Sequence, residues 1–340
     1  MRALLDAMGG DGGSESAVAA ALDFLRRHPA DEILLAGREA ELRSALEEKG
    51  GSKLRDRVTI LDCSEVITPE DEPVRAIRKK RDSSMVRGLR ALAEGDADFM
   101  VSAGNTGALM SGAVILVGRL CGFERPGLSS VIPTLDHHDL VMLDLGAGVD
   151  IKPRNLVQYA IMGAAYARAV MRKSEPRVAL LNIGTEPGKG DRLRREAYPL
   201  LVEWDGGAGS HFVGNVEARD LIKGGFDVIV TDGFTGNMVL KSFEGTGDAF
   251  RELTRRGFNF GLRSRVGGLL AGPSLRRQFR RYAYQAYGGA TLLGIEKPVI
   301  KCHGNAGAAA IASALELGHR AVTGEVAGLI SKSLEEVPNG

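Results

Sequence analysis

The sequence predicts an α/β protein with a doubly wound, mostly parallel sheet. Short runs rich in Val, Ile and Leu alternate with longer segments of helical periodicity along almost the whole chain, which is typical of βαβ units. Several of the short runs are apolar throughout, as strands buried on both faces are. Many of them end in glycine-rich turns. We therefore expect a Rossmann-like, three-layer architecture.

The expected elements follow from these patterns in order. The expected strands are Ala3 to Asp6, Glu32 to Ala36, Val58 to Leu61, Asp98 to Ser102, Val141 to Leu145, Val178 to Ile183, His211 to Val213, Asp227 to Thr231 and Val299 to Cys302. The expected helices are Ser14 to Arg27, Arg38 to Lys49, Ser83 to Glu94, Asn105 to Leu116, Pro153 to Arg172, Asp191 to Glu203 and Asn305 to Leu317. No internal repeat or low-complexity linker divides the chain. We expect residues 1–340 to form a single domain, with a helical insertion at about 245–285.

Composition excludes several classes of protein. The chain has 340 residues, of which 44% are hydrophobic, and its 44 Lys and Arg nearly balance 43 Asp and Glu. A net charge of +1 provides no overall field for nucleic acid, so we expect no nucleic-acid partner. The three cysteines, Cys63, Cys121 and Cys302, are far apart and predict neither a disulfide framework nor a zinc site.

The same features predict a cytoplasmic protein. Asp6 interrupts the first apolar stretch too early for a signal peptide. The uncharged stretch Ser102 to Gly118 is short for a membrane-spanning helix. The adjacent His137 and His138 have no carboxylate-rich partner segment, and we interpret them as a polar turn, so no metal site is expected.

The glycine-rich turns are the strongest functional signal. In a parallel sheet the turns after the strands share one edge, where ligands bind. Glycine lets backbone N–H groups approach an anion, and the following helix N-terminus adds a partial positive charge. We therefore expect one phosphate-binding crevice. The turns are at residues 8–13, 102–107, 145–148, 182–190, 214–217, 232–237 and 303–307.

A structural explanation of these turns stays open, because tight connections in α/β folds need glycine anyway. Four of the turns also contain asparagine, whose side chain both donates and accepts hydrogen bonds. No GxGxxG follows the first strand, and GTEPGKG is one residue too short for a P-loop. These absences weaken a dehydrogenase or ATPase interpretation. The asparagines are Asn105, Asn182, Asn215 and Asn237.

Taken together and in order, the motifs closely resemble those of the bacterial acyl-acyl carrier protein:phosphate acyltransferase family. The matching stretches span almost the whole chain. They are DAMGGD (6–11), VRAIRKKRDSSM (74–85), VSAGNTGALM (101–110), LDLGA (143–147), VQYAIMGAAYA (157–167), LLNIGTE (180–186), FVGNVE (212–217), DVIVTDGFTGNMVLK (227–241), YGGATLLG (287–294) and IKCHG (300–304).

The resemblance implies a reaction and a fold similar to the phosphotransacetylase and isocitrate dehydrogenase-like group. The implied reaction transfers a fatty acyl group from the thioester of acyl carrier protein to inorganic phosphate, at the start of phospholipid synthesis. It implies no metal or organic cofactor. Phosphate is a nucleophile at neutral pH, so such a site must mainly position it, stabilise an oxyanion and protonate the thiol.

Within that scheme, we expect three catalytic residues: Lys189, Asn237 and His303. Lys189 is equally compatible with a solvated loop lysine, and His303 with a buried structural histidine. Cys302 is a poor acyl-enzyme nucleophile, because neighbours on a strand point to opposite faces. Other turn residues are expected to bind phosphate or substrate, although the two carboxylates among them, Glu186 and Asp232, are favoured as residues that orient these donors or hold the turns. These are Gly9, Gly10, Asp11, Ser102, Asn105, Thr106, Asn182, Glu186, Asn215 and Asp232.

The family pattern is not matched everywhere. The family usually has asparagine after LDxGA, where this chain has Gly148, so one expected donor is absent. After the His303 and Gly304 pair the family often shows serine or alanine, whereas Asn305 and Ala306 follow here. These differences affect individual residue roles and leave the crevice in place.

Residues 251–281 form a basic, apolar segment. Nine arginines accompany one glutamate, with phenylalanine and leucine between them, and we expect two helices joined around Gly267, Gly268 and Gly272. Arginines suit an acidic carrier protein or an anionic membrane surface; packing on a second subunit is the alternative. The expected contact residues are Arg255, Arg256, Phe258, Phe260, Arg263, Arg265, Leu269, Leu270, Arg276 and Arg277.

Partners are implied by the resemblance only. They are acyl carrier protein, inorganic phosphate, a second copy in a homodimer, a peripheral membrane surface and a membrane-bound acyltransferase that uses acyl phosphate to acylate glycerol 3-phosphate. Two other functions stay open. One is a phosphotransacetylase-like enzyme that uses acyl-coenzyme A, and the other is a non-catalytic module that binds carrier protein or membrane.

Overall fold

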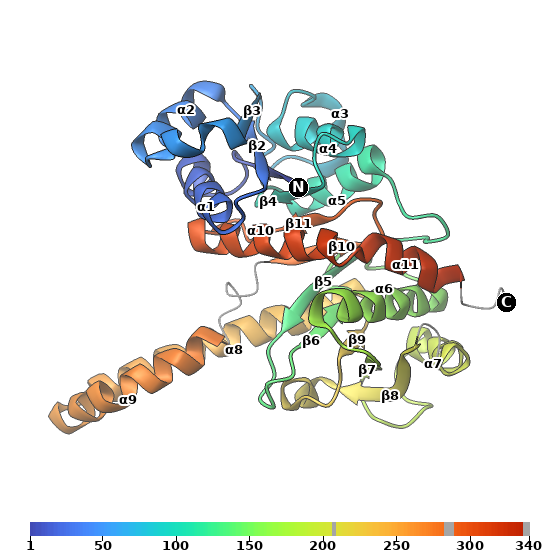
Figure 1. The fold of residues 1–340 in the computed structure, drawn as a ribbon. Coiled ribbons are helices and arrows are strands. Elements are labelled where there is room, and N and C mark those ends of the chain that lie inside the picture. Colours follow the sequence, from blue (N-terminus) through green and yellow to red (C-terminus); the bar gives the residue numbers. More distant parts are fainter. Residues whose placement is uncertain (206–208, 282–288, 336–340) are drawn as a thin grey trace.

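The computed structural model describes residues 1–205, 209–281 and 289–335. These residues form one 11-stranded sheet with helices on both faces, which confirms the predicted α/β class and the mostly parallel sheet (Figure 1). The strand order is β3-β2-β1-β4-β11-β10-β5-β6-β9-β7-β8. The expected helical insertion extends to about residue 285, and its part beyond Arg281 lies outside the described residues.

The bounds of the elements are as follows. The strands are β1 (Arg2–Asp6), β2 (Glu32–Gly37), β3 (Val58–Asp62), β4 (Phe99–Ser102), β5 (Gly127–Ile132), β6 (Leu140–Leu143), β7 (Arg177–Asn182), β8 (His211–Glu217), β9 (Val228–Val230), β10 (Ala290–Leu293) and β11 (Val299–Lys301). The α-helices are α1 (Gly13–Arg27), α2 (Glu39–Glu48), α3 (Pro73–Lys79), α4 (Ser84–Glu94), α5 (Thr106–Gly112), α6 (Pro153–Met171), α7 (Arg192–Trp204), α8 (Gly233–Asn259), α9 (Leu262–Arg281), α10 (Ala308–Thr323) and α11 (Val326–Glu335). A π-helical turn, Ala113–Val117, extends α5.

All nine expected strands are present within a few residues, but two central strands were not predicted. In β5 the buried Ser129 and Ser130 interrupt the apolar pattern. Their hydroxyls donate to the backbone carbonyls of Thr291 and Gly289, at 3.0 and 3.3 Å, on the neighbouring β10 segment. Strand β10 is short and follows a glycine-rich stretch. These hydrogen bonds offset the cost of burying the two hydroxyls. A sequence pattern, which cannot include them, assigns the two serines to a loop.

These two strands reverse the direction of the sheet. The pairs β11–β10, β10–β5 and β5–β6 are antiparallel, whereas the strands on either side of them are paired in parallel. Strands β6, β9, β7 and β8 therefore run opposite to β1, β4 and β11. The expectation that all glycine turns share one edge is wrong for this reason, and the turns form two groups. One turn was also misplaced, because residues 214–217 lie inside β8, paired with β7.

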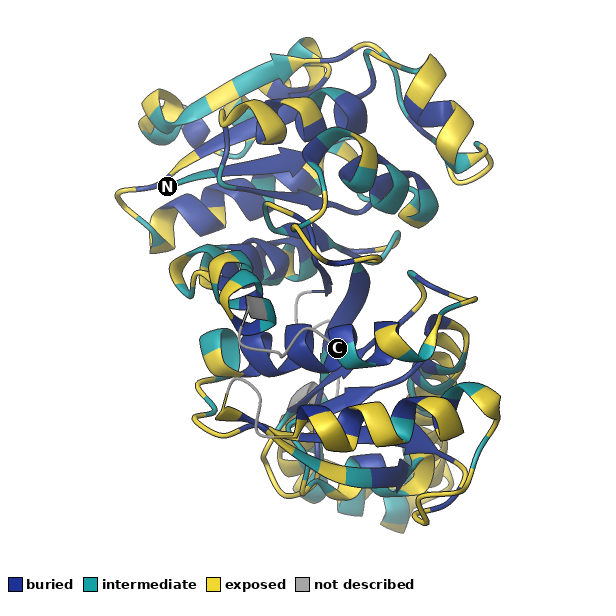
Figure 2. Ribbon diagram, turned by 90° about the vertical axis from the view of Figure 1, so that its right-hand side faces the viewer, coloured by how far each residue is buried: buried dark blue, intermediate teal, exposed yellow. Residues whose placement is uncertain are grey.

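The core lies on both faces of the sheet. Successive residues of β1 belong to different hydrophobic clusters: Leu5 lies on the face covered by α1 and α10, whereas Leu4 lies on the face covered by α4. Figure 2 shows the buried residues concentrated in the strands and in the helix surfaces that face them. Helix α6 is central core, since most of its side chains are buried. A Cβ on Gly163 would lie 2.4 Å from Cγ1 of Val228 in β9.

Helices α8 and α9 project from the body of the molecule (Figure 1). The predicted pair of helices is present, but the junction was misplaced. The chain turns at Phe260 and Gly261, and Gly267, Gly268 and Gly272 lie inside α9. A Cβ on Gly268 would lie 2.9 Å from Cβ of Phe258. This glycine therefore serves a close approach of the two helices.

Among the described residues, no helix is both long and apolar enough to span a bilayer.

We expect Gly163→Ala to destabilise the protein, because the added methyl group would overlap Val228. Overpacking lowers the stability by about 1–3 kcal/mol, and the better helix propensity of alanine offsets at most about 1 kcal/mol of this loss. The free energy of unfolding, measured by urea denaturation, should therefore fall. Gly245→Ala in α8 is the control, because a Cβ there meets open space. An unchanged or increased stability of the Gly163 variant would contradict the packing described.

Candidate active site

A buried carboxylate organises the first group of turns. Asp6 ends β1 and is 3% exposed. Its Oδ1 accepts hydrogen bonds from the backbone N–H groups of Met8 and Gly9, at 3.3 and 3.1 Å, and from the Ser84 hydroxyl at 2.7 Å. Its Oδ2 accepts from the Ser102 hydroxyl at 2.7 Å. Asp6 thus joins the first turn to β4 and to the start of α4.

The first turn is closely packed against its neighbours. A Cβ on Gly9 would lie 2.8 Å from Asp6 Oδ2, and one on Gly10, where φ is +85°, would lie 2.6 Å from the Gly304 carbonyl oxygen. The N–H of Asp11 donates to that carbonyl at 2.8 Å. Two of the three backbone donors that we expected to bind phosphate, those of Gly9 and Asp11, are therefore engaged within the protein. This corrects the expectation for these two donors.

The turn after β4 is likewise structural in part. Ser102 is fully buried, and its hydroxyl supports Asp6. Asn105 caps α5 by accepting from Ala108 N–H at 3.0 Å. Neither residue offers the free donor that we expected, whereas Thr106 is exposed at the start of α5. The Asn105 amide nitrogen donates to three carbonyls of the segment before α3, those of Thr68, Pro69 and Asp71.

A second buried carboxylate organises the turn after β6. Asp144 is fully buried and accepts four backbone N–H hydrogen bonds. Burial raises the pKa of Asp144, and these N–H donors oppose that effect. The donors are Leu128, Gly146, Ala147 and Gly148. At the position where the family usually has asparagine, the Gly148 carbonyl also accepts from Gly233 N–H at 2.8 Å.

Arg194 joins the turns after β7 and β9. It is 7% exposed, and its Nη2 donates to Oδ2 of Asp232 at 2.7 Å. Asp232 also caps α8 by accepting from Thr235 N–H at 2.8 Å. Burial alone would raise the pKa of Asp232, but the hydrogen bonds from Thr235 and Arg194 hold it below its usual range. Arg194 makes further hydrogen bonds with Leu181, Asp191, Thr231 and Thr235.

Two predicted asparagines hold the loop after β7. Asn182 donates to the Lys189 carbonyl at 3.0 Å, and Asn215 donates from β8 to the Glu186 carbonyl at 2.8 Å. We expected phosphate contacts from both amides, and the structure places their NH2 groups on the protein backbone instead. The side chains of Lys189 and Glu186 remain exposed and lie 3.8 Å apart. The loop therefore presents these two charged groups on a fixed backbone.

One face of α8 links the two groups of turns. Asn237, Lys241 and Glu244 are spaced by four and three residues, so they share that face. Asn237 is exposed, with its Cβ 3.9 Å from where a Cβ on Gly146 would lie. Further along, the Lys241 ammonium lies 3.2 Å from Nε2 of His303, and Glu244 Oε1 lies 3.7 Å from the same atom. Neither Lys241 nor Glu244 was among the predicted site residues.

His303 is half-buried at the mouth of a pocket. Burial, and then the Lys241 ammonium, lower the pKa of His303 below its usual value of 6.5, while Glu244 acts in the opposite direction. The imidazole is therefore neutral at pH 7. The preceding Cys302 is fully enclosed, and burial raises its thiol pKa to about 12. The thiol is thus protonated, which agrees with the expectation that Cys302 is not a nucleophile.

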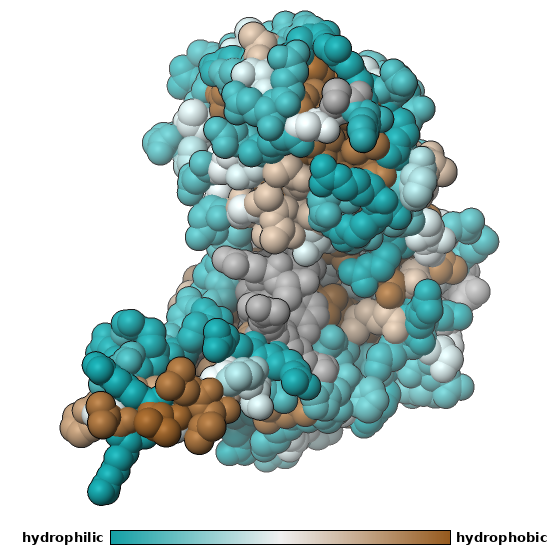
Figure 3. All heavy atoms as spheres, turned by 60° about the vertical axis from the view of Figure 1, so that its left-hand side comes forward, coloured by the Kyte–Doolittle hydropathy of each residue, from teal (hydrophilic) through white to brown (hydrophobic). Residues whose placement is uncertain are grey.

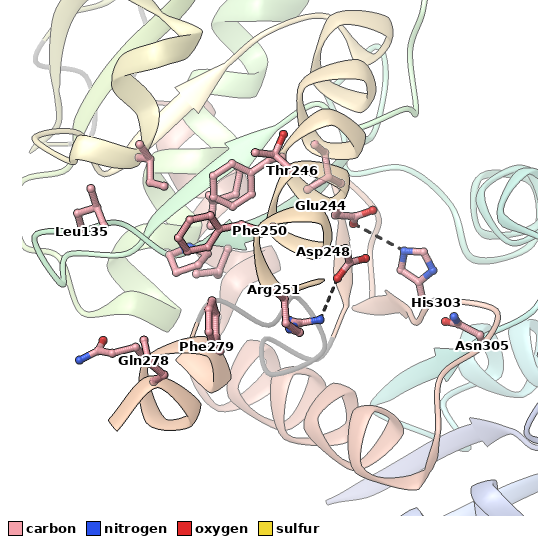
Figure 4. A pocket seen from close by; sticks show the side chains of 18 residues that line it. Leu135, Glu244, Thr246, Asp248, Phe250, Arg251, Gln278, Phe279, His303 and Asn305 are labelled. Atoms are coloured by element: carbon pink, nitrogen blue, oxygen red, sulfur yellow. Dashed lines mark hydrogen bonds and ion pairs between the residues drawn. The ribbon is translucent and has the colours of Figure 1, made fainter. Parts of the chain in front are cut away.

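The pocket has a volume of about 570 Å³, within the range of ligand sites. Figure 4 shows His303, Asn305 and Glu244 at one end and the rings of Phe250 and Phe279 at the other. These rings lie 6.1 Å apart, one from α8 and one from α9. The other apolar side chains that line the pocket are Val131, Ile132, Leu135, Ile222, Leu240, Phe243 and Leu275. The polar end therefore meets the turns, and the apolar end follows the projecting helices.

The projecting helices carry an exposed apolar surface, which we call the α8–α9 tip. Figure 3 shows hydrophobic side chains gathered there among polar ones. Phe260 is 92% exposed, and Phe258 is partly covered. Glu252 pairs with the exposed Arg255 and Arg256. The other apolar members of the tip are Leu253, Leu262, Val266, Leu269 and Leu270, and its further exposed arginines are Arg263, Arg265, Arg276 and Arg277.

Comparison with known sequences assigns the chain to a family. The sequence profile of a family described as "Fatty acid synthesis protein" matches residues 1–329. A phosphate acyltransferase of Lysinibacillus sphaericus is 44% identical over 99% of both chains. One of Exiguobacterium is 46% identical over 93% of this chain and 94% of that one. The chain belongs to this family of phosphate acyltransferases.

The fold of this chain also resembles a solved structure. A phosphotransacetylase from Streptococcus pyogenes superposes with a TM-score of 0.57 over 98% of this chain and 94% of that chain, at 17% sequence identity. At that identity the likeness concerns the fold alone. It agrees with the expected Rossmann-like architecture.

We expect Arg194→Met to destabilise the protein strongly, because it leaves the buried Asp232 carboxylate without its cation. Breaking a buried pair costs about 3–5 kcal/mol. Urea denaturation should report a lower free energy of unfolding of about that size. Arg195→Met, on the exposed neighbour, should change it by less than about 0.5 kcal/mol. Equal effects of the two substitutions would show that Arg194 does not join the turns as described.

Proposed function

We propose that this phosphate acyltransferase transfers a long-chain fatty acyl group from acyl carrier protein to inorganic phosphate, for phospholipid synthesis. The observation that carries the proposal is the pocket, whose polar end holds His303 and whose apolar end lies between α8 and α9. An acyl chain needs an apolar path, and its thioester carbonyl needs a polar end. The names of the relatives support an enzyme over a non-catalytic binding module.

The chemistry follows from the groups at the polar end. A phosphate oxygen attacks the thioester carbonyl carbon, and the carbon–sulfur bond then breaks to give acyl phosphate and the carrier-protein thiol. Neutral His303 accepts the phosphate proton and returns it to the sulfur. The Lys241 ammonium, 3.2 Å from the imidazole, supplies positive charge for phosphate or the oxyanion. Lys189 and Asn237 are further proposed contacts, on the exposed β7 loop and on the same face of α8 as Lys241.

The α8–α9 tip is the proposed docking surface for the carrier protein and for a membrane. Exposed arginines suit the acidic surface of a carrier protein or anionic lipid headgroups, and exposed Phe260, Leu269 and Leu270 suit an acyl or membrane environment. Peripheral attachment of a cytoplasmic homodimer would bring acyl phosphate close to a membrane-bound acyltransferase.

The first experiment measures release of free carrier-protein thiol from palmitoyl-acyl carrier protein as a function of phosphate concentration. We expect turnover that requires phosphate. His303→Ala should lower kcat by about 10²- to 10⁴-fold, the usual contribution of a general acid or base. His211→Ala, on an exposed strand position, is the matched control, and Lys189→Ala tests the predicted phosphate contact.

Three outcomes would contradict the proposal. Turnover without phosphate would exclude phosphate as the acceptor. Binding of the carrier protein without any turnover would favour the non-catalytic alternative. Faster reaction with palmitoyl-coenzyme A than with the carrier-protein thioester would instead favour the phosphotransacetylase-like alternative.

The pH profile provides a second prediction. If neutral His303 is the base, activity falls as the pH decreases through its pKa. Glu244 raises that pKa and Lys241 lowers it. Glu244→Gln should therefore shift the acidic limb of the kcat profile to lower pH, and Lys241→Met should shift it to higher pH. The titration of phosphate itself is the same in all three proteins. Shifts in the same direction would contradict the assignment of His303.

A further inference from the structure

A cluster of histidine and carboxylate side chains lies outside both groups of turns. His28 ends α1, Asp31 precedes β2, and His319 lies in α10. One possible ligand atom from each of these residues lies within 4.8 Å of the other two. The two imidazole rings are stacked, with their centroids 4.1 Å apart. The cluster therefore joins segments that are about 290 residues apart in the sequence.

Asp31 presents one carboxylate oxygen to this cluster. The residue is 7% exposed. Its Oδ1 accepts from the N-terminal ammonium of Met1 at 3.2 Å. Its Oδ2 is buried and has no hydrogen-bond partner among the described residues. This oxygen lies 3.2 Å from Nε2 of His319 and 4.0 Å from Nδ1 of His28. The ammonium thus satisfies Oδ1, whereas Oδ2 is a buried acceptor that faces two imidazoles without a hydrogen-bond donor, and a bound cation would satisfy it.

The orientation of His28 is also that of a metal ligand. Its Nε2 lies 2.9 and 3.0 Å from the two carboxylate oxygens of Glu316, one turn before His319 on α10. Glu316 is held in turn by Arg27, at 2.9 Å. With Nε2 on this carboxylate, the other ring nitrogen of His28, Nδ1, faces Asp31. Histidine ligands are commonly oriented in this way by a second carboxylate.

We propose that His28, Asp31 and His319 bind a divalent transition-metal ion, with Zn²⁺ as the best-matched ion. Zinc takes imidazole nitrogen and carboxylate oxygen at about 2.0–2.2 Å, so two tetrahedral ligands lie about 3.4 Å apart. The 3.2 Å separation of His319 and Asp31 matches this value, and the 4.0 Å separation of His28 and Asp31 requires a small inward movement. Water completes the coordination.

The ion would have a structural role. The ligands connect α1, β2 and α10, and the N-terminal ammonium adjoins them. The sequence did not predict the site, because its ligands are far apart along the chain and only His28 and Asp31 are close. Binding should stabilise the folded state without changing the reaction.

The test uses the full-length protein without a histidine tag, freed of metal with a chelator. Isothermal titration calorimetry with ZnCl₂ in phosphate-free buffer at pH 7.5 should show one ion per chain. His319→Gln should weaken binding about 100-fold or more, while the exposed His211→Gln should leave it unchanged. Thermal unfolding should show a Tm that rises with Zn²⁺ for the native protein and for His211→Gln only.

A second variant covers the case in which His319→Gln does not fold. Glu316→Gln keeps all three ligands and changes only the group that orients His28, so affinity should fall about 10- to 100-fold. Equal zinc affinity of the native protein and the His319 or Glu316 variant would overturn the proposal. Failure of the native protein to bind zinc at micromolar concentration would overturn it as well, and would leave the cluster as a network of ion pairs.

Discussion

The reversal of strand direction in the middle of the sheet determines the arrangement of the whole molecule. Strands β10 and β5 are each antiparallel to both neighbours, so the two parallel parts of the sheet run in opposite directions. Each part then has its own set of turns and its own buried carboxylate, Asp6 or Asp144. A site built from both sets needs an element that reaches from one to the other. Helix α8 is that element, beginning at the Asp232 cap and reaching His303.

The sequence predicted the parallel parts of the fold well, because their strands are buried on both faces and read as continuous apolar runs. It failed where partners far along the chain decide the structure. Ser129 and Ser130 look like loop residues until β10 accepts their hydroxyl hydrogen bonds. Gly267 and Gly268 look like a turn until they are seen to lie in a helix packed against α8. The secondary-structure propensity of a short stretch of sequence does not predict either of these contacts.

The candidate site shows a similar division. The turns and His303 were predicted, and the pocket brings His303 and Asn305 to its polar end. The roles of the asparagines were less predictable, because an amide that donates to a loop carbonyl and one that donates to a ligand have the same sequence signature. Asn105, Asn182 and Asn215 bind the backbone. Lys241 and Glu244 could have been found from their spacing after Asn237, had the helix been expected to begin at Gly233.

The continuity of α8 has a mechanical consequence. From Glu244 to the end of the helix at Asn259 is about 22 Å at 1.5 Å per residue. A helix holds that separation without the entropy that ordering a loop of equal span would require. The helical backbone therefore fixes the distance from the polar end of the pocket to the α8–α9 tip. Insertion or deletion of a single residue in this part of α8 would change both its length and the direction in which the tip faces.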